Sequence, residues 1–143
     1  MPKLEYFLVC ESVSIDRETN RISLFNVIED IHRVKPGTQI SSPLLFNLVA
    51  VSCWNKLEGD DDTDFQATLR IHHPPKEGGE ESEPTDLPLN FRMQSRRQRL
   101  LMRLATPVLP PAHDGRLRLE LLLNGRHCAE HEIGIIEKST DDL

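Results

Sequence analysis

Apolar and polar residues alternate with a period of two along much of this chain, and this alternation constrains the fold more than any other feature. In the segment 65–71, Phe65, Ala67, Leu69 and Ile71 alternate with polar side chains. Because successive side chains of a β-strand point to opposite faces, the pattern predicts a strand with one buried face and one wet face. The same alternation predicts strands over the segments 87–93, 99–104 and 116–123.

Two other segments, 6–10 and 44–54, are apolar at both parities. Such runs are typical of strands covered on both faces, although a buried helix gives the same pattern. Between them, the segment 21–34 has a broken period of two, and a β-bulge at Asn26 would explain the break. Seven or eight strands separated by polar turns predict an all-β fold, a two-sheet antiparallel β-sandwich of the immunoglobulin or C2 type.

The last predicted hairpin allows a test of strand register. Its Asn-Gly turn at 124–125 is typical of a two-residue type I′ turn. In an uninterrupted ladder that turn would place Leu119 opposite Glu130 on the core face, which is unfavourable for the charge. A three-residue loop would instead place Leu119 opposite Ala129 or His131. We therefore predict the three-residue loop.

With 143 residues, the chain has the length of one domain, which we place at 1–136, followed by a flexible acidic tail at 137–143. The cysteines, Cys10, Cys53 and Cys128, are odd in number and lack a C-x-x-C pair, so we predict packing residues in a reducing compartment. The sequence has neither a secretory signal nor an apolar run near the roughly 20 residues that span a bilayer. We expect a cytoplasmic protein without membrane insertion.

Positive charge is concentrated in the segment 87–113, which has five arginines and no acid although the whole chain has a net charge of −6. These arginines are Arg92, Arg96, Arg97, Arg99 and Arg103. No aromatic residue is interleaved with them to stack on bases, and the protein is acidic, so nucleic acid is not the expected ligand. We predict contact with an acidic protein partner or a second copy of the chain. The alternative is an edge hairpin whose charges prevent aggregation.

The loop 58–64 concentrates negative charge. Its aspartates, Asp60, Asp61, Asp62 and Asp64, offer the oxygen ligands that calcium prefers. The loop lacks the glycine and glutamate spacing of an EF-hand, and we prefer to interpret it as a solvated turn between two strands. A calcium-dependent C2-like ligand-binding domain is therefore an alternative function.

The six histidines give no zinc motif. On one strand, His127 and His131 would lie about 13 Å apart, too far to share a metal ion. We interpret the histidines as surface or half-buried residues; they are His32, His72, His73, His113, His127 and His131.

The sequence contains no glycine-rich phosphate loop, no G-x-S-x-G elbow and no H-E-x-x-H motif. We therefore predict no catalytic residues and no cofactor. The leading hypothesis is a non-enzymatic protein-interaction or self-association module, and a hydrolase with an unrecognised site is a further alternative.

Two stretches carry a family resemblance. Cys10-Glu11-Ser12, followed by the strand at 21–31, and the closing segment 119–135 with its Asn-Gly turn are similar to an uncharacterised family of short bacterial proteins, a domain of unknown function. The resemblance spans residues 4–136 and consists of apolar strand positions and turns. It implies a compact β fold and supplies no site residues.

Overall fold

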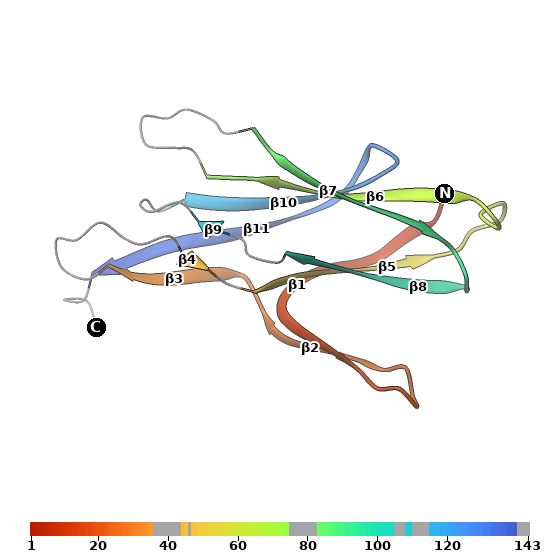
Figure 1. Cartoon of the computed structure of the whole chain (residues 1–143), viewed down its shortest axis with the longest axis horizontal. Coiled ribbons are helices and arrows are strands. Elements are labelled where there is room, and N and C mark those ends of the chain that lie inside the picture. Colours follow the sequence, from red (N-terminus) through yellow and green to blue (C-terminus); the bar gives the residue numbers. More distant parts are fainter. Residues whose placement is uncertain (36–43, 46, 75–82, 105–107, 110–114, 140–143) are drawn as a thin grey trace.

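The computed structural model of the chain describes residues 1–35, 44–45, 47–74, 83–104, 108–109 and 115–139. These residues form eleven strands and no helix (Figure 1), so the predicted all-β class is confirmed. No segment in this part of the chain is therefore a helix that could cross a membrane.

Sheet A has four antiparallel strands in the order β2-β1-β5-β8. These strands are β1 (Lys3–Ile15), β2 (Ile22–Val27), β5 (Leu48–Asn55) and β8 (Arg97–Leu104).

Sheet B has five strands in the order β3-β11-β10-β6-β7, and only the β3–β11 pair is parallel. These strands are β3 (Asp30–Lys35), β6 (Asp64–His72), β7 (Thr85–Arg92), β10 (Gly115–Leu123) and β11 (Arg126–Ser139). A short pair joins β4 (Leu44–Leu45) to β9 (Val108–Leu109).

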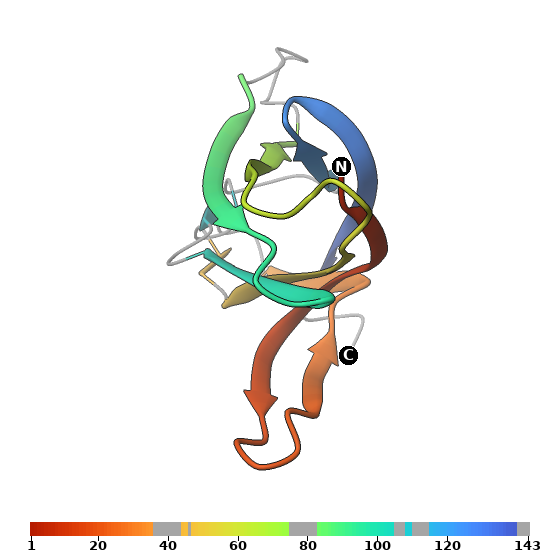
Figure 2. The same ribbon diagram turned by 90° about the vertical axis from the view of Figure 1, so that its right-hand side faces the viewer.

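The main core is formed by side chains of both sheets. Trp54 of sheet A is fully buried, and its ring centroid lies 6.2 Å from that of Phe91 on sheet B. The indole Nε1 donates a hydrogen bond to Ser52 Oγ at 2.9 Å, which satisfies its polar group inside the core. Figure 2 shows sheet B curled over sheet A. The two sheets therefore share one apolar layer.

A second, smaller core lies on the face of sheet A that is turned away from sheet B, here called the outer face. Every residue from Leu48 to Trp54 on β5 is buried, as its two apolar parities predict. The side chains on one face of β5 join the main core, and on the other face Val49 and Val51 pack against Cys10. The β1–β2 hairpin covers this second core with partly buried apolar residues, Val13, Ile22 and Leu24. Both views place the hairpin on the side of β5 and β8 that faces away from sheet B (Figures 1 and 2), so sheet A folds back over its own outer face.

The predicted β-bulge at Asn26 is wrong. The register between β1 and β2 stays in step from Ile15–Ile22 to Cys10–Val27, without a shift. Asn26 instead has a left-handed φ of 55°, shortly before the chain leaves sheet A to begin β3 in sheet B. The broken period therefore marks a crossing between sheets.

The last hairpin combines a correct register with an incorrectly predicted loop. Its turn at 124–125 has two residues, with φ angles of 48° and 79°, which are typical of a type I′ turn, so the three-residue loop is wrong. A β-bulge in β11, where Cys128 is inserted opposite Leu121 and Leu122, supplies the shift instead, and Leu119 pairs with His131 as predicted. The charge of Glu130 is thereby kept off the core face.

The end of β11 extends past the predicted boundary. Residues 137–139, which we assigned to the tail, continue the strand and pair with β3. Residues 140–143 lie outside the described part, and the single-domain assignment stays a prediction.

Candidate functional site

The arginine-rich segment does not form the hairpin that we considered. It begins in β7, which pairs with β6 in sheet B, and continues in β8, which pairs with β5 in sheet A. The bend at 93–96 carries the chain from one sheet to the other. Among the described strands, β7 and β8 are each the last of their sheet. The segment therefore follows two sheet edges on one side of the molecule.

Two arginines of the segment, Arg92 and Arg96, do not lie on β8. Arg92 lies on sheet B, where its Nε and Nη2 both contact the Asp64 carboxylate. This pairing raises the pKa of Arg92 and lowers that of Asp64. Arg96 lies in the bend with an exposed side chain, and its carbonyl oxygen accepts a hydrogen bond from the Lys56 backbone at 2.8 Å.

Three arginines share the outer face of sheet A. Arg97, Arg99 and Arg103 alternate along β8, and they pair across β5 with residues whose side chains also point outward. We call these three residues the arginine face.

A β-bulge in β1 places a carboxylate next to Arg97, the first of these arginines. The register of β1 shifts between Leu4 and Tyr6, and the inserted residue is Glu5. Nε and Nη2 of Arg97 face the two carboxylate oxygens of Glu5, each at 2.9 Å. Cys53 Sγ donates to the same carboxylate at 3.6 Å. Glu5 therefore neutralises one of the three guanidinium groups.

The second arginine fastens the hairpin to the sheet. Arg99 Nη2 donates to the carbonyl oxygen of Asn20 at 2.8 Å and to its Oδ1 at 2.6 Å. Arg103, the third, makes no side-chain hydrogen bond or ion pair with the described part of the chain.

A cleft of about 470 Å³ opens between the hairpin and the arginine face, and we call it the arginine cleft. It is lined by Tyr6, Asn20, Arg21, Ile22, Cys53, Arg97 and Arg99. Burial, and then the neighbouring Cys53, raise the pKa of Tyr6. Burial also raises the pKa of Cys53, and the hydrogen bond from its thiol to Glu5 raises that pKa further. Both groups are therefore uncharged near neutral pH, and the charge of the cleft comes from its arginines.

The four aspartates predicted as calcium ligands have different surroundings. Asp60 is buried and accepts a hydrogen bond from the Leu57 backbone at 2.7 Å, whereas Asp61 pairs with Lys56 at 2.8 Å. Asp62 has a φ of 56° in the exposed turn, and Asp64 binds the arginine of β7.

Within the described residues, no group of three or more His, Cys, Asp or Glu side chains could hold a metal ion. Calcium binding stays a prediction, which calorimetry at millimolar calcium would test.

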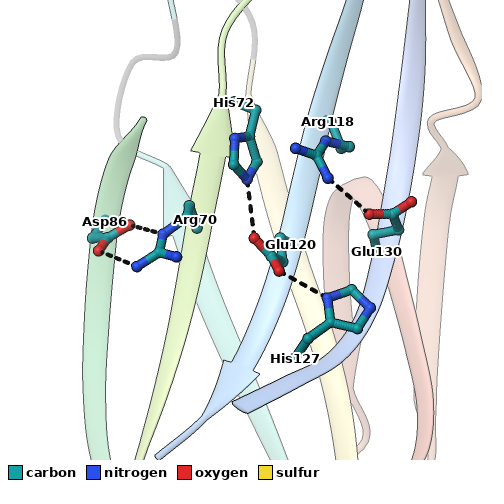
Figure 3. A network of polar contacts seen from close by, with 7 residues as sticks. All are labelled: Arg70, His72, Asp86, Arg118, Glu120, His127 and Glu130. Carbon is teal, nitrogen blue, oxygen red and sulfur yellow. Dashed lines mark hydrogen bonds and ion pairs between the residues drawn. The ribbon is translucent and has the colours of Figure 1, made fainter. Parts of the chain in front are cut away.

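Sequence reasoning missed a polar network on sheet B (Figure 3). Glu120 Oε1 lies 3.0 Å from His72 Nε2, and Glu120 Oε2 lies 2.8 Å from His127 Nδ1. The glutamate side chain is only 15% exposed, and its hydrogen bonds, first to His72 and then to His127, lower its pKa. The three residues come from β6, β10 and β11, so only the strand register could have revealed the network.

The same face of sheet B pairs its arginines with carboxylates across strands. Arg70 makes a bidentate contact with Asp86 at 2.8 and 3.0 Å, and Arg118 contacts Glu130 at 3.1 Å (Figure 3). This face therefore has little excess charge, in contrast to the arginine face.

The remaining predicted side chains are structural or peripheral. Cys10 and Cys53 are buried as predicted, but Cys128 is exposed, because it is the residue inserted at the β-bulge of β11, and its assignment as a packing residue is wrong. His131 Nε2 lies 2.6 Å from the Ile28 carbonyl oxygen, which links β11 to the β2–β3 crossing. His113 lies outside the described residues.

Comparison with known proteins gives a fold likeness. No protein-family model matches the sequence, and no curated protein matches it. The structure is similar to part of a solved structure of the Pseudomonas fluorescens alkylpurine DNA glycosylase AlkC bound to DNA containing an abasic site analog, with a TM-score of 0.56 and 9% identity. The alignment covers 94% of this chain but spans only 30% of the length of that protein. At this identity the likeness concerns the fold alone.

Proposed function

We propose that this chain is a non-enzymatic interaction module that binds an acidic protein partner, or a second copy of itself, on the arginine face. One observation carries the proposal. An edge strand of sheet A places three guanidinium groups on one exposed side of the molecule, although the protein as a whole is acidic. Such a local excess of positive charge attracts and orients a negatively charged partner.

The contrast with sheet B supports this proposal. The arginines of Figure 3 are matched by carboxylates on neighbouring strands. On the arginine face, only Arg97 has a carboxylate partner among the described residues, and Arg99 binds the neutral Asn20. The positive charge of this face is therefore left for a partner to neutralise.

We also propose that the two sheets form an immunoglobulin-like sandwich. In such domains strands A, B and E lie in one sheet and strands G, F and C in the other. The orders β1-β5-β8 and β11-β10-β6-β7 agree with this arrangement, with β7 in the place of strand C′. Loops and edges of such sandwiches often serve as binding surfaces.

A hydrolase is the weaker candidate. Nucleophilic catalysis by Cys53 would need an accessible thiolate next to a base. Glu5 accepts a hydrogen bond from this thiol, but Cys53 is 1% exposed and its pKa is raised.

The three free cysteines are consistent with action in a reducing compartment, and we propose the cytoplasm.

The test uses Arg103, the arginine of the arginine face that is exposed and whose side chain has no partner among the described residues. We expect R103E to weaken binding of a fluorescent decaglutamate peptide at least fivefold at low salt, and to reduce any dimer mass seen by light scattering. The control, R126E, makes the same charge change at the start of β11 in sheet B and should bind normally. Equal weakening by both variants, or by neither, would overturn the proposal.

A further inference from the structure

We infer that the arginine cleft binds a doubly charged anion, the phosphate group of a phosphorylated side chain on the protein partner. The inference rests on the proposed function, because the cleft opens on the arginine face.

The charge of the cleft favours a dianion. Arg21, Arg97 and Arg99 line it, and Glu5 is the carboxylate that neutralises one of them. Three guanidinium groups against one carboxylate leave two excess positive charges. A phosphoserine carries about −1.5 to −2 charges at neutral pH, whereas an aspartate or glutamate carries only one.

Hydrogen-bond donors remain free in the cleft. Each guanidinium has five N–H donors. Arg99 uses Nη2 on Asn20, and within the described residues its Nε and Nη1 make no hydrogen bond. The Arg21 side chain makes none in that part of the chain. A planar guanidinium group binds two oxygens of a phosphate or of a carboxylate at once. A phosphorylated side chain offers three acceptor oxygens, one more than a carboxylate, and can therefore serve more than one arginine.

The dimensions of the cleft fit a side chain. Its volume of about 470 Å³ lies within the range of small-ligand sites. Ile22 and the Tyr6 ring supply apolar surface for the carbon atoms next to the phosphate, and Cys53 closes the floor.

Nucleic acid fits less well. Its phosphodiesters carry one charge each, and single-strand binding normally uses several stacked aromatic side chains. Tyr6 is the one aromatic among the residues that line the cleft. The net charge of −6 also repels an extended polyanion.

The experiment compares four probes with the full chain at 150 mM salt. These are a seven-residue Gly/Ala peptide with one central phosphoserine, the same peptide with serine, the same peptide with glutamate, and a 15-nucleotide single-stranded DNA. We expect the phosphopeptide to bind at least tenfold more tightly than the others and to be displaced by inorganic phosphate. Equal binding of the glutamate peptide, or tighter binding of the DNA, would overturn the inference.

Two variants with the same charge change locate the site. R21Q should weaken phosphopeptide binding at least fivefold, whereas R17Q, in the same turn but outside the cleft, should leave it unchanged. An equal effect of both variants would contradict the inference. If decaglutamate binds on the arginine face without any preference for the phosphopeptide, the inference alone fails. If neither probe binds, the proposed function fails as well.

Discussion

Arg99 and Asn20 lie 79 positions apart in the sequence, yet Arg99 Nη2 donates to both the main-chain and the side-chain oxygen of Asn20, at 2.8 and 2.6 Å. Asn20 has a left-handed φ of 57°, a conformation that asparagine tolerates better than most residues. This contact holds the far end of the β1–β2 hairpin against the outer face of sheet A. The second core and the arginine cleft both depend on that position.

Removing this contact should loosen the hairpin. We expect R99A to lower the free energy of unfolding by about 1 kcal/mol, since it removes charged hydrogen bonds at a partly exposed site. Hydrogen exchange of the β2 amides should accelerate more than that of β6. R103A, on the same face of the same strand, is the control and should change stability by less than about 0.5 kcal/mol. Unchanged β2 exchange in R99A would contradict the assigned role.

The Glu120 network predicts a pH dependence of stability. Because hydrogen bonds to His72 and His127 lower the folded pKa of Glu120 below its ordinary value of 4.5, its contribution is fully present above that pH. The contribution is lost as the pH falls through the lowered pKa. Urea unfolding between pH 5 and 3 should therefore show a shallower loss of stability for E120Q than for the parent protein. E130Q controls for the removal of one carboxylate on the same face, and a parent-like slope in E120Q would refute the assignment.

The type I′ turn predicts a specific glycine requirement. No atom lies within 4 Å of a Cβ added at Gly125, so an alanine there is strained only by the φ of 79°. G125A should cost about 1–2 kcal/mol in urea unfolding, the usual penalty for the left-handed conformation. G125N should restore part of this loss, because asparagine adopts the left-handed conformation more readily than alanine. Equal costs for the two variants would argue against the turn type.

Thiol reactivity tests the burial of the cysteines. In the native protein we expect Ellman's reagent to modify only Cys128, because Cys10 and Cys53 are buried and have raised pKa values. The pKa of Cys128 is also raised by local desolvation, so its reaction should accelerate from pH 7 to 9. All three thiols should react in urea, and C128S should be inert when folded. Rapid modification of a second native thiol would show that the second core is open.

Strands with one buried face were the easiest to predict. In β6, Phe65 to Ile71 alternate strictly, and the structure buries each apolar residue of that series. The prediction of such a strand succeeds because it needs only local information. Whether each residue is apolar or polar indicates which face of the strand it lies on.

Elements that depend on distant contacts were not predictable. Neighbouring strands in a sequence usually pair, so the strands around 93–96 suggested a hairpin, whereas their apolar residues instead complete opposite sheets. The folding of the β1–β2 hairpin over the outer face of sheet A escaped prediction for a similar reason. A residue such as Val49 shows in the sequence only that it is buried, not what covers it.

The candidate site was likewise predictable only where the information is local. The clustering of arginines was visible in the sequence, but their distribution depends on register: Arg92 binds a carboxylate on sheet B, and Arg103 lies on the opposite sheet. Arg21 was not predicted, since only the folded hairpin brings it next to β8. No pattern in the sequence therefore marks Arg21 as part of the site.

The most direct test of the central claim is the dissociation constant of the decaglutamate peptide for R103E relative to R126E, measured at 25 mM and 150 mM salt. We predict at least fivefold weaker binding for R103E at low salt and a normal constant for R126E. We also predict that the difference shrinks at 150 mM salt, because salt screens exposed charges. Indistinguishable constants for the two variants would contradict the assignment of the arginine face as the binding surface.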